Sequence, residues 1–255
     1  MISNLKDFAK SKGIILPDQQ LIADEAASII TSRHSSGGYD IKSHFDELID
    51  ETQAEIYNVF LNKQENYGRH LMKEFGSKIV TDGEINRIDD LGDTLGDYFT
   101  VFDTFYLGLS QSRKSRAGKS FEVVIKGLIK QLGYPFDEQK VIDGKPDFIM
   151  PNYRHFRNNP TDSIILTAKR TLRERWRQIV TEGTRGLGFY LATIDDKMTS
   201  SQLHEAHLNR ITLVCPERIR ALSYSGVVNV MSFSQFFADV LDPAMVRWRR
   251  NGIIV

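Results

Sequence analysis

Hydrophobic positions in the N-terminal part of the chain recur at helical spacing. The segment DQQLIADEAASIITSR (18–33) repeats apolar residues every three or four positions, which is typical of an amphipathic helix. A longer stretch of the same kind covers 41–76, where Gly76 is expected to end it. A third helix is predicted over 91–112, with its aromatic residues on one side. Residues 1–112 are therefore expected to form a helical region.

Beyond this region, short apolar runs alternate with amphipathic segments. GKSFEVVIKGLIKQLG (118–133) predicts a helix that ends at Gly133. The expected strands lie in YPFDEQKVIDGKPDFIMP, with a turn at Asp143-Gly144, and in DSIILTAK, LGFYLATID, RITLVCP and VVNVMS. The expected helices are LRERWRQIVTEGT, SSQLHEAHLN, PERIRALS and SQFFADVL. This alternation predicts an α/β fold with a mixed central β-sheet flanked by helices. The boundary is expected in a basic loop over 113–118, so that 113–255 form the second domain.

Composition narrows the class of protein. A hydrophobic fraction of 41% in 255 residues is ordinary for a globular protein. No apolar run approaches the roughly 18 residues that a membrane span requires, and MISNLKDFAKSKG lacks the apolar centre of a signal peptide. The single cysteine, Cys215, excludes an internal disulfide and is expected to be a small buried residue rather than a nucleophile. We therefore expect a cytoplasmic protein without a membrane partner.

Charge is balanced overall but segregated along the chain. Lys and Arg together number 33, as do Asp and Glu, so the formal net charge is zero and any contact with nucleic acid must come from local clusters. One cluster, RKSRAGK, supplies Arg113, Lys114, Arg116 and Lys119. The other is KRTLRERWR (169–177), whereas the N-terminal half is acidic, as in HFDELIDETQAE.

Two residues at strand ends carry candidate chemistry. Asp147 opens the apolar run of KPDFIMP, and Lys169 closes that of SIILTAK. Alone, Asp147 is typical of a turn and Lys169 of a strand edge. Together, on neighbouring strands, they bring a carboxylate and an ammonium to one end of a sheet. Phosphodiester hydrolysis uses this combination, because carboxylates hold Mg²⁺ while a cation orients water or offsets charge on the phosphate.

The sequence indicates the position of a second metal-binding acid less clearly. Many metal nucleases place it two residues before the lysine, but here that residue is Thr167, which has no carboxylate. A helix after Lys169 would align Glu182 with Arg175 on its polar side, which makes Glu182 the candidate. The alternative is that Glu182 is a solvated helix carboxylate.

Glu122 is a further acid, at the edge of the apolar face of its predicted helix. A charge in that place needs a partner. A metal site would provide one, and an ion pair with Lys126 or Arg116 would equally do so.

The segment Arg173-Glu174-Arg175 presents a donor, an acceptor and a donor. In the major groove, arginine reads the O6 and N7 atoms of guanine and glutamate accepts from the amine of cytosine. This favours adjacent G and C edges as the ligand, provided that the segment lies at a helix entry. Local salt bridges on a surface helix are the alternative.

The ordered set PDFIMP, ILTAK, RER and Glu182 resembles type II restriction endonucleases of the PD-(D/E)xK superfamily, in the branch of EcoRII, Ecl18kI and PspGI. The resemblance covers roughly Arg113 to the C-terminus. It implies a restriction-endonuclease-like core in which Asp147 and Glu182 bind the metal and Lys169 is the catalytic lysine. SRKSRAGKSFE is similar to that branch's helix with an additional acid, here Glu122.

The resemblance also implies Mg²⁺-dependent cleavage of both DNA strands at a palindrome with a CC/GG core, of the CCGG, CCNGG or CCWGG type. Arg173, Glu174 and Arg175 would read that core. A homodimer or larger assembly and a companion DNA methyltransferase are expected partners. If a central base is flipped out, Tyr39, Phe45 or Tyr67 could stack on it. The helical region could dimerise, contact flanking DNA or regulate. A repair or junction nuclease of the same fold, and a non-catalytic DNA-binding protein, are the alternatives.

Overall fold

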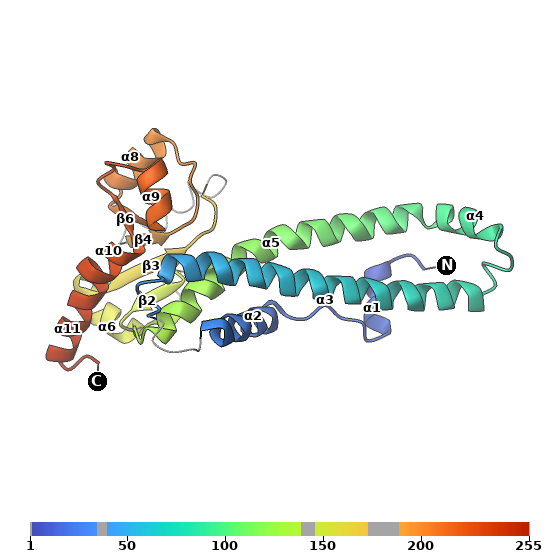
Figure 1. Ribbon diagram of the computed structural model, residues 1–255, viewed down its shortest axis with the longest axis horizontal. Coiled ribbons are helices and arrows are strands. Elements are labelled where there is room, and N and C mark those ends of the chain that lie inside the picture. Colours follow the sequence, from blue (N-terminus) through green and yellow to red (C-terminus); the bar gives the residue numbers. More distant parts are fainter. Residues whose placement is uncertain (1, 35–39, 139–145, 173–188, 255) are drawn as a thin grey trace. The chain divides into compact units, whose positions relative to one another are not determined.

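The computed structural model describes residues 2–34, 40–138, 146–172 and 189–254 (Figure 1). By its internal contacts the chain divides into two compact units. We call Met1–Arg33 with Ala54–Ser120 the helical unit, and His34–Gln53 with Phe121–Val255 the sheet unit. None of the described helices is long and apolar enough to cross a membrane.

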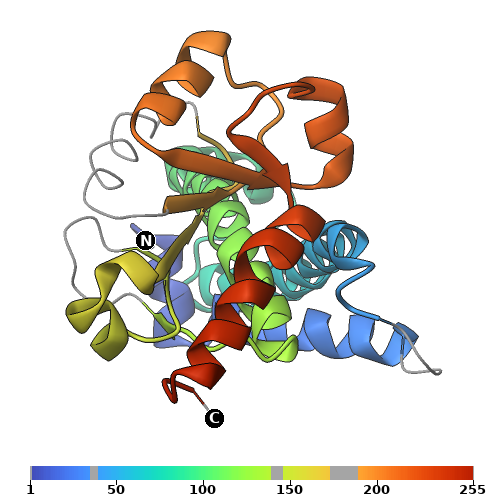
Figure 2. The same ribbon diagram turned by 90° about the vertical axis from the view of Figure 1, so that its left-hand side faces the viewer.

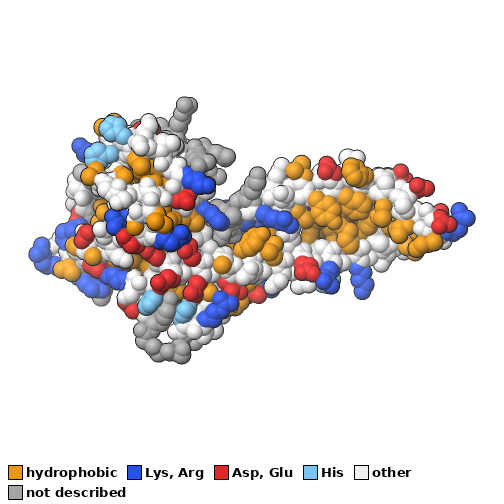
Figure 3. Space-filling view, turned by 45° about the horizontal axis from the view of Figure 1, so that its top comes forward, with side chains coloured by type: hydrophobic (Ala, Val, Ile, Leu, Met, Phe, Trp, Pro, Cys, Tyr) orange, Lys and Arg blue, Asp and Glu red, His pale blue; other side chains and the backbone are white. Residues whose placement is uncertain are grey.

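The helical unit consists of α1 (Leu5–Ser11), α2 (Gln19–His34), α4 (Asp90–Asp97) and most of the long helices α3 (Phe45–Thr81) and α5 (Phe99–Gln131). Its core is aromatic: the Phe75 ring meets the Tyr98 ring edge-on at 4.9 Å between centroids, and Tyr67 stacks on Phe105 at 6.2 Å. Figure 3 shows hydrophobic side chains gathered on the surface of this unit, where Phe99 is 72% exposed.

Three local expectations for these helices are wrong. Gly76 does not end α3, which continues to Thr81 and stops where Gly83 adopts a positive φ of 74°. The helix expected over 91–112 is divided at Tyr98 into α4 and α5. The basic loop expected over 113–118 is instead part of α5. Lys, Arg and Ala are good helix formers, and one interior glycine costs only about 1 kcal/mol, which tertiary packing offsets. The end of α5 before Gly133, whose φ is 75°, is as expected.

The sheet unit contains a six-stranded sheet in the order β1-β2-β3-β4-β5-β6 among the described residues. The strands are β1 (Asp137–Glu138), β2 (Phe148–Met150), β3 (Ile164–Ala168), β4 (Phe189–Ala192), β5 (Ile211–Cys215) and β6 (Val230–Ser232). The pairs β1-β2 and β2-β3 are antiparallel, while β3 to β6 run parallel. The expected mixed sheet is therefore confirmed.

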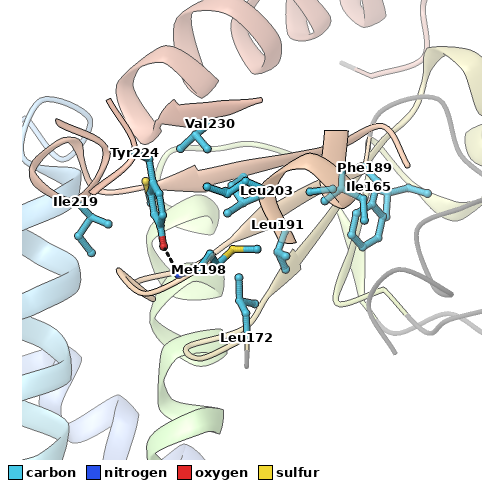
Figure 4. Packing of buried hydrophobic residues seen from close by; sticks show 13 residues of the cluster. Ile165, Leu172, Phe189, Leu191, Met198, Leu203, Ile219, Tyr224 and Val230 are labelled. Carbon is cyan, nitrogen blue, oxygen red and sulfur yellow. Dashed lines mark hydrogen bonds between the residues drawn. The ribbon is translucent and has the colours of Figure 1, made fainter. Parts of the chain in front are cut away.

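Helices cover both faces of this sheet (Figure 2). On one face, α8 (Ser200–Leu208) and α9 (Glu217–Ser223) contribute Leu203 and Ile219 to a buried cluster that also contains Leu191 of β4 (Figure 4). On the other face, the Tyr190 ring of β4 contacts the Phe236 ring at 4.9 Å between centroids. Phe236 begins η2 (Phe236–Leu241), which lies between α10 (Phe233–Gln235) and α11 (Asp242–Arg250). The helix expected at SQFFADVL thus extends further than the pattern indicated.

Besides these helices and the ends of α3 and α5, the sheet unit has two short helical elements among the described residues. They are α6 (Tyr153–Asn158) and the 3-10 turn η1 (Pro160–Asp162), which connect β2 to β3. The Asn152 side chain caps α6 by accepting a hydrogen bond from the His155 N–H at 2.8 Å. This connection brings β3 back alongside β2 in antiparallel orientation.

Candidate active site

Asp147 and Lys169 lie together in the sheet unit. The Lys169 ammonium is 3.0 Å from Asp147 Oδ2 and 3.3 Å from Oδ1. Asp147 is 5% exposed, whereas 22% of the Lys169 side chain is accessible. The lysine therefore contacts a buried carboxylate and still reaches the surface.

The strand pair β2-β3 produces this arrangement. Phe148 pairs with Leu166 in antiparallel register, and the same register continued by one residue brings Asp147 opposite Thr167. Directly opposed residues on antiparallel strands point to the same face of the sheet. By the alternation along β3, Lys169 shares that face with Thr167. Two residues that are 22 apart in sequence thus meet at one end of the strand pair.

Backbone hydrogen bonds hold both residues in place. The Ala168 N–H donates to Asp147 Oδ2 at 2.8 Å, and the Lys169 N–H donates to the Ala192 carbonyl of β4 at 2.9 Å. The Asp147 carboxylate therefore has an N–H donor as well as the ammonium, which offsets the cost of burying its charge. This geometry leaves the ammonium with donors for a phosphate or a water, because lysine has three.

Thr167 adds an unsatisfied polar atom to this face. It is 1% exposed, and its hydroxyl oxygen has no hydrogen-bond partner among the described residues. A buried hydroxyl without a partner is unfavourable unless a ligand or water completes it. Sequence reasoning treated Thr167 only as a missing acid, whereas the structure makes its hydroxyl a candidate contact for such a ligand.

The described residues contain no group of three or more His, Cys, Asp and Glu side chains that could hold a metal ion. Mg²⁺ does not require one, since it binds one or two carboxylates and retains several waters. Asp147 supplies one such carboxylate and is therefore compatible with this ion. The second predicted ligand, Glu182, lies outside the described residues and stays a prediction.

The predicted base-reading residues also lie outside the described part of the chain. They are Arg173, Glu174 and Arg175. The described chain stops at Leu172, directly before them, and resumes at Phe189, the first residue of β4.

Glu122 is half-buried in α5 and takes part in an interaction, so it is not a free carboxylate. The two cations that were considered as its partners also have other contacts. Lys126 forms an ion pair with Glu138 at 2.7 Å. Arg116 donates to the Pro17 carbonyl at 3.4 Å and stands over the Phe60 ring at 5.2 Å. A role for Glu122 at the metal stays a prediction.

The basic segment of α5 has structural contacts within the helical unit. Arg113 Nε donates to the Gln64 side chain of α3 at 3.0 Å. Arg116 makes the contacts described above, and Lys119 is exposed. The side chain of Lys114 lies outside the described part. DNA contacts by these four residues stay predictions.

Two of the aromatic residues considered for base stacking lie in cores. Phe45 is 1% exposed and packs against Phe233 and Phe237 at 4.9 and 4.8 Å between centroids. Tyr67 is 7% exposed. Their burial gives both a packing role, while Tyr39 lies outside the described residues. Cys215 is fully buried, and burial raises the pKa of its thiol to about 12, so the expectation that it is not a nucleophile agrees with its surroundings.

Comparison with known proteins gives a consistent result. The family described as EcoRII C terminal matches residues 84–237. The type II restriction enzyme SsoII of Shigella sonnei is 31% identical over 195 residues, which cover 68% of this chain and 62% of SsoII. The type II restriction enzyme EcoRII of Escherichia coli is 30% identical over 139 residues, which cover 52% of this chain and 34% of EcoRII. The chain thus spans less than two thirds of either relative.

Two solved structures share the fold. Metal-depleted Ecl18kI in complex with uncleaved DNA superposes with a TM-score of 0.77 at 23% identity, over 98% of this chain and 86% of that one. The complex of the restriction endonuclease PspGI with substrate DNA gives a TM-score of 0.59 at 20% identity, over 91% and 94%. The expected restriction-endonuclease-like core is confirmed, and the match over 84–237 shows that the chain belongs to the EcoRII C-terminal family.

Proposed function

We propose that this protein is a type II restriction endonuclease that hydrolyses both strands of DNA at a specific site. The observation that carries the proposal is the contact of 3.0 Å between the Lys169 ammonium and the buried Asp147 carboxylate, in a chain of this family. Hydrolysis of a phosphodiester needs a positioned water and a way to offset the charge that develops on the phosphate. These two side chains supply the groups for both.

In this proposal Asp147 and Glu182 hold Mg²⁺. The bound ion would offset phosphate charge and lower the pKa of a water. Lys169 would donate a hydrogen bond to the attacked phosphate or orient the attacking water. The buried Thr167 hydroxyl would hold a water on the same face. The Lys169 ammonium contacts Asp147, and since lysine has three donors, others would be available for the phosphate.

Specificity would come from Arg173, Glu174 and Arg175, which read a CC/GG core of the CCGG, CCNGG or CCWGG type. A palindrome is matched by a two-fold protein, so a homodimer is expected, with double-stranded DNA as its ligand. The exposed apolar surface of the helical unit supports contact with a second copy. A cytoplasmic location and a companion methyltransferase are part of the same proposal.

Plasmid digestion with Mg²⁺, followed by sequencing of the ends, tests activity, site and cut position together. We expect discrete ends from the wild-type protein and no ends from Lys169→Ala, which should still bind the same DNA in a gel-shift assay. Lys130→Ala, at an exposed position of α5, is the control and should cut normally. Absence of cutting by the wild type on DNA of mixed sequence would refute the nuclease function, and wild-type rates in Lys169→Ala would refute the role of the lysine.

A further inference from the structure

Asp195 is a buried carboxylate that the proposed chemistry does not use. It is 8% exposed and follows β4 by three residues. Both of its carboxylate oxygens accept backbone hydrogen bonds: Oδ2 from the Leu172 N–H at 2.8 Å and Oδ1 from the Lys197 N–H at 3.0 Å. Its own N–H donates to the Thr193 hydroxyl at 3.0 Å. The Tyr224 hydroxyl donates to its carbonyl at 2.6 Å. Asp195 is therefore fixed from several sides.

One of these hydrogen bonds joins Asp195 to Leu172, which lies in the chain between the proposed catalytic lysine and the proposed base-reading residues. Leu172 comes three residues after Lys169 and directly before Arg173. Its side chain is fully buried and belongs to the cluster that contains Leu191 and Met198, toward which it points in Figure 4. Packing alone would hold the side chain, whereas the bond to Asp195 also fixes the direction of the backbone.

Residues 192–195 accept a backbone hydrogen bond from Lys169 and another from Leu172, the two ends of the connection that follows β3. Ala192 accepts from the Lys169 N–H at 2.9 Å, and Asp195 accepts from the Leu172 N–H. The catalytic lysine and the start of the predicted base-reading segment are thus tied to residues 192–195. A shift of this stretch would move both together, and loss of one bond would uncouple them.

A carboxylate suits this task better than an amide of the same size. Burying a charge is unfavourable unless hydrogen bonds offset it, and an ionised carboxylate accepts at both oxygens. Asparagine accepts at one oxygen only, so its NH₂ group would face either the Leu172 N–H or the Lys197 N–H. Replacing Asp195 by Asn therefore breaks one bond and places two donors against each other.

We propose that Asp195 is a positioning residue for specificity: through the Leu172 N–H it fixes the backbone of the residue that directly precedes the predicted base-reading residues. This inference rests on the proposed nuclease function. Displacement of a positioned group by about 1 Å can change a rate by about 100-fold. Loss of the Asp195 contact should therefore weaken the discrimination between the correct site and a changed one more than it weakens cutting itself.

The experiment measures single-turnover cleavage of two DNA duplexes, one with the site found by plasmid digestion and one with a single base pair of its core changed. For Asp195→Asn we expect the ratio of the two rates to fall about tenfold or more. Asp196→Asn makes the same chemical change at an exposed neighbour and should leave the ratio at the wild-type value. A purely structural role would lower both rates in proportion to the folded fraction, so a ratio that is unchanged both in Asp195→Asn and in Asp195→Ala, which removes both acceptor oxygens, overturns the proposal. An equal fall in Asp196→Asn also overturns it.

Two further measurements keep the proposal testable if Asp195→Asn does not fold. Thr193→Val removes the acceptor of the Asp195 N–H, and we expect a smaller fall in the ratio. In the wild type, amide hydrogen exchange of peptides that include Leu172 should show protection of that N–H, and rapid exchange would overturn the proposal. Failure of the nuclease function itself would be distinct, because then the wild-type protein would cut neither duplex.

Discussion

At the scale of single residues, the contact between Asp147 and Lys169 changes what each side chain can do. Asp147 alone is typical of a turn, and Lys169 alone of a strand edge. In the structure the carboxylate is buried and is balanced by an ammonium and an N–H group. A charge held in this way has a fixed direction, which a metal ligand or a group near a phosphate requires.

Thr167 provides the first prediction. Its buried hydroxyl has no hydrogen-bond partner among the described residues, so removing it costs no hydrogen bond within the protein. Thr167→Val, which keeps a similar volume, should therefore leave the free energy of unfolding unchanged or raise it by about 1–2 kcal/mol. Cleavage should slow, because valine could not hold the water that we propose for this hydroxyl in the complex with DNA and metal. Urea unfolding and single-turnover cleavage measure the two effects. A lower stability would contradict the assignment, and Thr212→Val, at a half-buried position of β5, is the control.

Arg175 provides a prediction about recognition. If it reads guanine, Arg175→Ala should weaken binding of the correct site by about 1–3 kcal/mol and leave binding of unrelated DNA nearly unchanged. Titration of labelled duplexes at one fixed salt concentration measures both. Equal weakening on all sequences would make Arg175 a phosphate contact instead.

At the scale of elements, apolar periodicity predicted strands β2 to β6 because each is a short run of mostly buried residues, whereas β1 is not. The long helices were predicted less well. Gly76 and the basic segment both read as ends, yet α3 and α5 continue through them. A local cost of about 1 kcal/mol for an interior glycine is small beside the burial of residues such as Phe75.

The candidate site likewise contains some residues that the sequence predicts and others that it does not. Asp147 and Lys169 could be predicted because each stands at the end of an apolar run. Asp195 could not, since its bond to Leu172 joins residues that are 23 apart and leaves no periodic signal in the sequence. The lack of a hydrogen-bond partner for the Thr167 hydroxyl could not be predicted from the sequence either, because it depends on which groups surround β3 in the fold.

Asp162 joins several elements and gives a prediction at this scale. Its carboxylate bonds to His155 of α6 at 2.9 Å and to Arg247 of α11, and its carbonyl accepts from Trp248 at 3.1 Å. Burial alone would raise the pKa of Asp162, but the hydrogen bonds and charges of Arg247 and His155 outweigh it and hold the pKa below its usual value.

A folded-state pKa below the unfolded one means that the stabilisation is present above about pH 4 and is lost as the pH falls through the folded-state pKa. Asp162→Asn should therefore lower the free energy of unfolding by about 1.5–3 kcal/mol at neutral pH. Denaturant unfolding from pH 7 to pH 3 should show the difference from wild type shrinking in acid. Asp239→Asn, at an exposed position, should show no such trend, and a difference independent of pH would contradict the ionic role.

At the scale of the whole molecule, zero net charge means that the proposed DNA binding would depend on local clusters rather than on the protein as a polycation. The helical unit contains a hydrophobic cluster rich in aromatic rings, and the sheet unit contains one built on the strands. A probe buried in one of these clusters reports the opening of the unit to which it belongs.

Cys215 is such a probe for the sheet unit, because it is the only cysteine of the chain and is fully buried in β5. Burial raises its thiol pKa to about 12, so at pH 8 the folded protein holds almost no thiolate. In the unfolded chain the thiol pKa is about 8.5, and the thiolate fraction rises sharply. Reaction with a thiol reagent such as DTNB at pH 8 should therefore be slow in native buffer and should accelerate with urea as the sheet unit opens. Cys215→Ala should show no reaction at any urea concentration, and rapid labelling of the native wild type would mean that β5 is open to solvent, which would contradict the burial of Cys215.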